Sequence, residues 1–498
     1  MSESDSPTER AERAIGRGRE LLDGAYLRAD QLLDHGQTRA LRFLWFFLPE
    51  TSIARRPRLQ QVLVSRFLSD AGQQSLAYGA LIAVVQGGGS ALDAALIGVA
   101  ALLPPAALGL YGGAIADALP KRVALAMAYN LQALLCFLAP TLLGTDLAAL
   151  MALIFAVNVL GQVSGPTESA VLPLLVTDAQ MATAASLIGL ASSLGSAFGT
   201  ALLAPVLVRA FGVEPVIYLA GVLLLLAASR VFDLPTGEPE PDEKSPLVIL
   251  RPQVRVRAAI DWLTRQPAVA TMMVVAVIAG TAQIVIQTLA PRYVQAVLHV
   301  EAADAVYVFA PSAAGLALAL VLAPRLISAL GERTCSLVGF CFVTAVLVLL
   351  GLVGPVRDAI DPVNPARLLS LAGITMEDRL RTAALLALPL GFGIALTSTS
   401  VQTYINRRVP HGFQGRAFAL QSSLKNGAAI VPLLTLGAAA SAFGVESVLI
   451  AAPFVLLAVA YGLIQLSRYF GGQAPSFGID VLASFWEEPA PEAFVKPQ

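Results

Sequence analysis

The chain has 498 residues, of which 56% are hydrophobic and only 13% are charged, and its formal net charge is −1. Soluble proteins carry about 25% charged residues, so this composition and a mean hydropathy of +0.71 exclude an ordinary soluble protein. A helix needs about 20 apolar residues to cross a bilayer, and roughly twelve such segments fit in this sequence.

Residues 1–59 are polar and rich in arginine, which predicts an N-terminal extension in the cytoplasm and no cleavable signal peptide. Ile15, Leu22, Tyr26 and Leu33 recur at helical spacing beside many charges. This pattern predicts an amphipathic helix on the membrane surface or on the inner face of the protein. The alternative is a partly disordered tail.

Residues 60–232 hold six apolar segments and form the first predicted domain, an N-terminal six-helix bundle. Pro104-Pro105 should kink the second helix. In the fifth helix, Gly195-x-x-x-Gly199 is flanked by Ser192 and Ser196, which predicts a small-residue face for close helix packing. The six helices are expected at about 61–85, 92–113, 123–143, 148–166, 181–206 and 215–232.

Residues 233–267 change character, because they are charged and contain proline. They predict a cytoplasmic linker in which 253–265 can form a surface helix. Residues 268–468 then form a C-terminal six-helix bundle, and 469–498 form an acidic cytoplasmic tail. Its helices are expected at about 269–290, 304–324, 335–354, 382–404, 416–439 and 446–467.

Two internal repeats relate the halves of the chain. The sequence AFGVE occurs at Ala210–Glu214 and again at Ala442–Glu446, an offset of about 232 residues. Pro120, before one basic stretch, corresponds more weakly to Gly331, before another. Repeats of this kind predict two pseudo-symmetric halves, an arrangement found in membrane transporters.

The connection between the second and third helices marks the predicted cytoplasmic side. An apolar run ends at Gly112-Gly113, Asp117 follows, and the basic pair Lys121-Arg122 precedes the next apolar run. Basic residues gather in cytoplasmic connections. Most Lys and Arg residues of the short connections fall on this same side, which predicts that both termini are cytoplasmic.

The spacing Gly113-x-x-x-Asp117-x-x-x-Lys121-Arg122 resembles the loop between the second and third helices of major facilitator transporters. The match is partial, since Ala118 replaces the usual arginine and Pro120 the usual glycine. The resemblance implies an all-α integral membrane protein with twelve transmembrane helices in two six-helix bundles. It also implies a cytoplasmic gate in which Asp117 contacts the start of helix eleven, formed by Gly113, Asp117, Lys121, Arg122, Gly415 and Arg416.

Three further stretches look like bacterial exporters of the enterobactin-exporter type. They are Arg66-x-x-Ser69-Asp70-x-Gly72, Gly165-Pro-Thr-Glu-Ser-Ala-Val-Leu-Pro173, and Gln402-Thr-Tyr-Ile-Asn-Arg-Arg-Val-Pro410 followed by Gly415-Arg416. What this resemblance implies is alternating access and proton-coupled efflux of a small amphipathic compound, drug-like or siderophore-like, by an antiporter of the bacterial inner membrane.

Ionisable residues inside a span cost several kcal/mol on insertion scales and are functional candidates. Asp70 in the first helix and Lys425 in the eleventh are expected at similar depth near mid-bilayer. One interpretation is a proton-sensitive pair that opens and closes during transport. The other is local: Arg66 and Asp70 are four residues apart and can pair on their own helix, leaving Lys425 to snorkel or to bond carbonyls.

Uncharged amides provide candidates for the substrate cavity, because the resemblance places helices one, four, seven and ten around it. They favour neutral or amphipathic compounds over sugar phosphates, and they can equally bridge helices. These residues are Gln73, Gln74, Asn158, Gln162, Gln283, Gln287 and Gln402.

No catalytic set, metal cluster, phosphate loop or nucleotide fingerprint is recognisable, so the sequence predicts neither an enzyme nor a cofactor or nucleic-acid partner. The expected partners are membrane lipid, a small-molecule substrate and protons. Two alternatives remain open. One is a lysophospholipid transporter or flippase-like protein; the other is a transport-inactive subunit or assembly factor, which would hold a stable protein partner.

Overall fold

The computed structural model describes residues 56–118, 120–177, 180–231, 267–301, 306–360, 377–408 and 411–470. The predicted amphipathic helix near residues 15–33, the surface helix at 253–265 and the acidic tail lie outside these ranges. The predicted domain boundaries therefore stay predictions.

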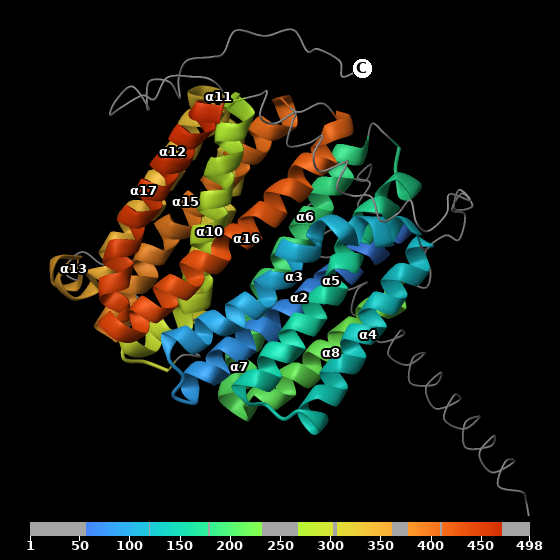
Figure 1. Ribbon diagram of the computed structural model, residues 1–498, viewed down its shortest axis with the longest axis horizontal. Helices are drawn as coiled ribbons and strands as arrows, with labels where there is room; N and C mark the ends of the chain where they lie inside the picture. Colours follow the sequence, from blue (N-terminus) through green and yellow to red (C-terminus); the bar gives the residue numbers. More distant parts are fainter. Residues whose placement is uncertain are drawn as a thin grey trace, which may run out of the picture.

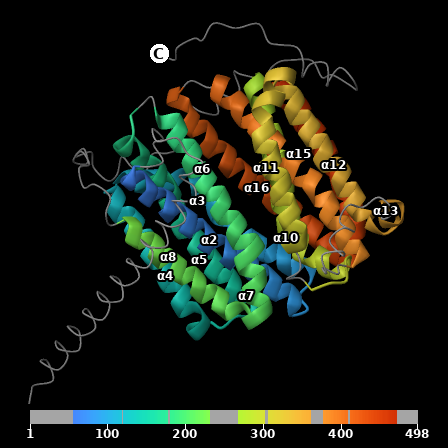
Figure 2. The same ribbon diagram turned by 180° about the vertical axis from the view of Figure 1, so that it is seen from behind.

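Every described element is a helix, and the helices form two bundles that lie side by side (Figures 1 and 2). The N-terminal bundle contains α2 (Pro57–Gln86), α3 (Ala91–Ala118), α4 (Lys121–Leu142), α5 (Leu147–Leu175), α6 (Met181–Phe198), the π-helical turn η3 (Gly199–Leu203), α7 (Ala204–Phe211) and α8 (Val213–Val231). The C-terminal bundle contains α10 (Pro267–Ala296), α11 (Val306–Leu330), α12 (Glu332–Gly351), the short α13 (Val353–Ile360), α15 (Asp378–Arg408), α16 (His411–Phe443) and α17 (Val445–Phe470).

Ten helices in the described residues are long and apolar enough to cross a membrane. Two other long helices, α2 and α17, are not among these ten. Helix α2 contains the charged residues Arg66 and Asp70, and the apolar stretch of α17 is the shorter segment Val445–Val455. With these two, and with α6, η3 and α7 counted as one continuous element, the described residues form twelve spanning elements. The predicted twelve-helix, two-bundle fold is confirmed.

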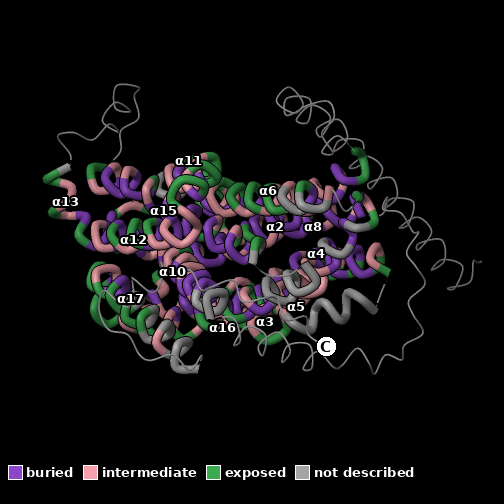
Figure 3. The backbone as a smooth tube through the Cα atoms, turned by 90° about the horizontal axis from the view of Figure 1, so that it is seen from above, coloured by how far each residue is buried: buried purple, intermediate pink, exposed green. Residues whose placement is uncertain are grey.

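Helix α4 shows how the fold meets the membrane. Met127, Leu131, Leu134, Leu138 and Leu142 recur every three or four residues and are all exposed, up to 72% for Leu142. An apolar stripe of this width on an outer surface suits lipid rather than water. Figure 3 shows buried residues running through the middle of both bundles, with exposed residues gathered at the periphery.

The two ends of the bundles are named here by one connection each. The Gly87 face carries the connections at Gly87–Ser90, Leu143–Asp146, Gly212, Val297–Glu301, Leu352 and Gly444. The Pro120 face carries Pro120, Val176–Gln180 and Gly331, together with the first residues of α2 and α10.

The AFGVE repeat forms the same corner twice. In each copy a helix ends at the phenylalanine, the glycine turns the chain, and the next helix starts at the valine. Gly212 has φ 83° and Gly444 has φ 86°, a left-handed conformation that costs glycine little and other residues much. The predicted internal repeat is therefore confirmed by structure.

Some helices end later than hydropathy indicates. Helix α3 continues to Ala118 and α5 to Leu175, so Gly112-Gly113 and Gly165–Pro173 lie inside helices and not in turns. The connection between α12 and α15 contains the short helix α13. The physical reason is that hydropathy marks the part of a helix that crosses apolar lipid, whereas backbone hydrogen bonding continues beyond it.

The predicted small-residue face of α6 packs against α2. A side-chain carbon at Gly195 would lie 3.1 Å from Phe67 Cα, and one at Gly199 would lie 3.0 Å from the Ser75 backbone nitrogen. Only glycine lets two helix backbones approach this closely. The contact positions Ser192, on the same helix, beside α2.

The bundles join from the Gly87 face to the middle of the membrane. Helices α3 and α16 run antiparallel: Leu92 N donates to Ser441 Oγ at 3.0 Å, and Ser423 Oγ donates to the Ala106 carbonyl at 2.9 Å. At the surface Arg209 of α7 forms a 3.5 Å ion pair with Glu301, which follows α10.

The apolar packing agrees with this. One continuous core includes residues of both bundles near the Gly87 face, such as Ala94 and Val297. Nearer the Pro120 face, three smaller apolar clusters each stay within one bundle, around Leu172 in the N-terminal bundle and around Met272 and Cys335 in the C-terminal bundle.

Candidate functional site

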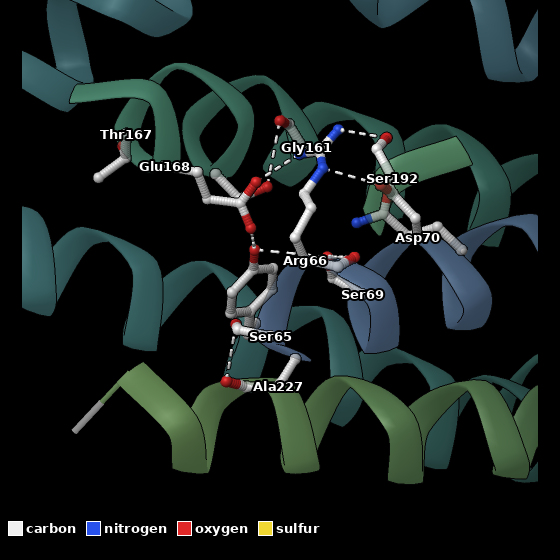
Figure 4. Close-up of polar contacts among 12 residues, drawn as sticks. Ser65, Arg66, Ser69, Asp70, Gly161, Thr167, Glu168, Ser192 and Ala227 are labelled. Atoms are coloured by element: carbon white, nitrogen blue, oxygen red, sulfur yellow. Dashed lines mark hydrogen bonds and ion pairs between the residues drawn. The ribbon is translucent and has the colours of Figure 1, made fainter. Parts of the chain in front are cut away.

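Four helices of the N-terminal bundle bring polar side chains together around Arg66 of α2 (Figure 4). Its Nε lies 2.8 Å from Asp70 Oδ2, one turn along the same helix. One terminal nitrogen pairs with Glu168 Oε2 of α5, and the other donates to Ser192 Oγ of α6 at 3.2 Å. The guanidinium thus connects α2, α5 and α6.

Tyr129 of α4 closes the cluster from the other side. Its hydroxyl donates to Glu168 Oε1 and lies 3.5 Å from Ser69 Oγ. Tyr129 is 0% exposed and Glu168 is 2% exposed, so this part of the cluster is shut off from solvent. Buried polar groups need partners, and Glu168 has one on each oxygen.

The arrangement leaves the two carboxylates in different situations. The Asp70 side chain is 13% exposed and the Arg66 side chain 24%, against 3% for Glu168. Arginine stays charged in proteins. With both acids ionised the cluster carries one positive and two negative charges, so binding a single proton makes it neutral.

The cluster lies deep in the bundle. Asp70 is the fourteenth residue of the 30-residue helix α2, about 20 Å along its axis from the helix start at the Pro120 face. Charged groups at this depth are costly unless they are paired, and each charge here faces an opposite one.

Glu168 was not predicted as a site residue from the sequence. Because α5 continues past Gly165-Pro166, Glu168 lies inside a helix and points at Arg66. The sequence contained one sign that the helix continues past Glu168, namely the apolar residues Val171-Leu172 that follow it. The sequence contained no sign of the contact between Tyr129 and Glu168, because nothing in it shows that α4 and α5 lie side by side.

Asp70 and Lys425 do not pair in this conformation. Asp70 contacts Arg66, as the local interpretation expects, whereas Lys425 of α16 lies along α10 in the other bundle. The hypothesis that Asp70 and Lys425 form a pair that opens and closes during transport stays a prediction.

The predicted cavity amides divide into three groups. Gln73 Nε2 donates to Gln132 Oε1 of α4 at 3.2 Å and bridges two helices. Asn158 and Gln162 donate to the carbonyls of Ile154 and Asn158, four residues earlier in each case. The rest have no such bond among the described residues: Gln283 is half-buried, and Gln74, Gln287 and Gln402 are exposed. A substrate role for each stays a prediction.

The predicted gate lies at the Pro120 face, but its central contact is outside the described side chains. Gly113 and Asp117 are in the last turns of α3, and Gly415 and Arg416 are in the second turn of α16, which starts at His411 and not at 416. Lys121 and Arg122 begin α4. A contact between Asp117 and α16 stays a prediction.

Among the described residues, no three His, Cys, Asp or Glu side chains lie close enough together to hold a metal ion. Cys136, Cys335 and Cys341 are all free thiols.

A multi-pass helical membrane protein with a buried charge cluster between its helices is typical of secondary transporters. Residues 62–432 match the sequence model of the Major Facilitator Superfamily, and the chain belongs to that family. It is therefore an integral membrane protein of a transporter family. Comparison with curated proteins found no match.

Two solved structures show the same fold. The D323A mutant of the nucleoside transporter NupG has 12% sequence identity and a TM-score of 0.63, over 82% of this chain and 99% of that one. A bacterial homologue of the human lysosomal transporter Spinster, inward-facing and unoccupied, has 13% identity and a TM-score of 0.64, over 85% of this chain and 100% of that one.

Proposed function

We propose that this chain is a proton-coupled exporter that moves a small amphipathic compound by alternating access. The observation that carries the proposal is the Arg66 cluster, in which one permanent cation faces two carboxylates inside a membrane bundle. Binding of one proton there changes the charge of the cluster without leaving an unpaired ion.

Asp70 is the proposed proton carrier, because it is the more exposed of the two acids. Glu168 is held on both oxygens, by Arg66 and by Tyr129, and acts as the acid that stays paired with Arg66 when Arg66 leaves Asp70. When a conformational change draws Arg66 away from Asp70, the carboxylate loses its counter-ion and takes up a proton.

We also propose the orientation. The Pro120 face carries Lys121, Arg122, Arg325 and Arg333 near its connections, and basic residues favour the cytoplasm. With that face inside, both termini are cytoplasmic, the membrane is the bacterial inner membrane, and the Gly87 face is outside. The conformation is then closed to the outside, because the bundles join at the Gly87 face.

The test uses full-length protein in proteoliposomes with an imposed pH gradient. Compounds are first selected because they raise the melting temperature of the purified protein. Asp70→Asn should still bind and exchange such a compound but should no longer concentrate it, because an amide keeps the shape of the carboxyl group and cannot titrate. Asp93→Asn, which changes an acid in the first turn of α3, is the control and should keep coupled transport.

If Asp70→Asn vesicles concentrate the compound at the wild-type rate, the proton site lies elsewhere. Glu168→Gln then separates the two acids: loss of coupling in this variant alone would move the proton from Asp70 to Glu168.

A further inference from the structure

Lys425 lies in the middle of α16 and its side chain extends along α10. A side-chain carbon at Gly280 would lie 2.7 Å from Lys425 Cγ, and Thr281 Oγ1 is 3.5 Å from the Lys425 carbonyl. The absence of a side chain at Gly280 thus provides the space that the lysine stem occupies. Lys425 is the fifteenth residue of a 33-residue helix, so its backbone is about 20 Å from the helix start.

The ammonium group of Lys425 has no counter-ion in the described part of the chain. Helices α10, α11 and α16 contain no Asp or Glu at all. The acids of α12, α15 and α17 stand in the first turns, at Glu332, Asp378 and Glu446. Asp70 and Glu168 of the other bundle are both held by Arg66.

The internal repeat relates Lys425 to the Arg66 cluster. Phe211 ends α7 as Phe443 ends α16, an offset of 232. The π-helical turn η3 holds one extra residue, so residues before it have an offset of 233, and Lys425 is the counterpart of Ser192. Helices α2 and α10 start at residues 57 and 267, an offset of 210, which makes Gly280 the counterpart of Asp70.

The second half therefore repeats the site of the first half with its charges changed. In the first half, Ser192 and Asp70 both contact Arg66. In the second half, lysine replaces the serine and glycine replaces the aspartate. The cation is present, and the position that would carry its counter-ion has no side chain.

The surroundings of Lys425 include both bundles. Ser423, two residues earlier on α16, bonds to Ala106 of α3. One turn along α3, a side-chain carbon at Gly109 would lie 3.6 Å from Gln162 Oε1 of α5. On α10, Gln283 and Gln287 follow Gly280 at helical spacing on the same face. Amides of both bundles thus lie around the helices that hold the lysine.

We propose that Lys425 binds an anionic group of the transported substrate, which makes that substrate an amphipathic organic anion with a carboxylate, sulfonate or phosphate group. This rests on the proposed transport of an amphipathic compound and specifies its charge. An ammonium group inside a membrane is costly while unpaired, so a ligand that brings the missing negative charge binds more tightly than a neutral ligand of the same shape.

The test compares three probes with the same apolar body, namely 4-phenylbutyrate, 4-phenylbutanol and 4-phenylbutylammonium. Their binding to the full-length protein is measured by calorimetry in nanodiscs of phosphatidylcholine. The wild type should bind the anion at least about tenfold more tightly than the other two probes. Lys425→Met should lose this preference, Lys425→Arg should keep it, and Arg209→Met, which removes an exposed cation, should leave it unchanged.

A second pair of variants supplies the missing counter-ion within the chain. Gly280→Asp should pair with Lys425 and abolish the preference for the anion, whereas Gly280→Asn, of matched size, should reduce all three affinities alike. Equal affinities of the three probes in the wild type, absence of binding by the anion, or an unchanged preference in Lys425→Met would each overturn the proposal.

Nanodiscs that contain phosphatidylglycerol distinguish the source of the anion. Competition that depends on Lys425 means that the anionic group belongs to a lipid headgroup, and lack of competition means that it belongs to a free solute. Transport is measured separately in proteoliposomes. Movement of all three probes without preference refutes the lysine site alone, whereas binding of the anion without any transport refutes the proposed function.

Discussion

Arg66 is shared by two carboxylates that come from different helices, and this sharing is what makes the site sensitive to a single proton. The sequence indicated Arg66 and Asp70, because they are one helical turn apart in an apolar segment. It did not indicate Glu168 as the third member, since the pairing depends on how α5 packs beside α2.

Tyr129 provides a test of the fixed part of the cluster. Tyr129→Phe removes the hydroxyl that donates to Glu168 and leaves a buried carboxylate oxygen without that partner. The free energy of unfolding should fall by about 1–3 kcal/mol, as measured by denaturant titration in mild detergent. Tyr218→Phe is the control, because its ring stacks on Phe137 and no hydrogen bond of its hydroxyl is seen among the described residues. Equal effects of the two variants would contradict this account.

At the scale of elements, the contact between α6 and α2 decides where the cluster can form. Gly195 and Gly199 bring the two backbones together, and this places Ser192 within reach of Arg66. The sequence predicted a small-residue face on this helix but not its partner. The partner depends on the positions of all six helices of the bundle.

Gly195→Ala should therefore destabilise the protein, although alanine is normally the better helix former. Its methyl group would press on the backbone of Phe67, and overpacking of this kind costs about 1–3 kcal/mol. Gly189→Ala, on the same helix with nothing within 4 Å of the added carbon, should be neutral or slightly stabilising. Thermal melting in detergent measures both, and a stabilised Gly195→Ala variant would show that α6 and α2 are not in close contact.

For the whole molecule, the important feature is that the two bundles are joined from the Gly87 face to the membrane centre. The contact of α3 with α16 and the ion pair between Arg209 and Glu301 both cross the bundle boundary. Exposed ion pairs contribute little stability, typically 0–1 kcal/mol, so this face can open without a large barrier from that pair.

A disulfide across this boundary should lock the conformation. In a protein whose three native cysteines are replaced by serine, Leu92→Cys with Ser441→Cys should cross-link, because the Leu92 nitrogen lies 3.0 Å from Ser441 Oγ. Transport in proteoliposomes should stop on oxidation and return on reduction. The control is Gly221→Cys with native Cys136 retained, a pair inside one bundle. A cross-linked boundary pair that transports normally would contradict alternating access through this face.

The sequence by itself determined the fold class of this protein, because crossing lipid requires long apolar helices and leaves a strong linear pattern. It also determined the internal repeat, since AFGVE forms a helix–glycine–helix corner at both places where it occurs in this chain. Both depend on local backbone chemistry and on neighbouring residues.

Tertiary structure alone decided which polar and charged groups of different helices meet. Glu168 reaches Arg66 because α5 continues as a helix, and Tyr129 joins them from α4. Lys425 lies over Gly280, and no acid of the described part of the chain pairs with it. These contacts join residues up to 145 positions apart, as between Gly280 and Lys425 (425 − 280). The physical reason is that electrostatic pairing depends on distance in space, whereas hydropathy and helix formation depend on distance along the chain.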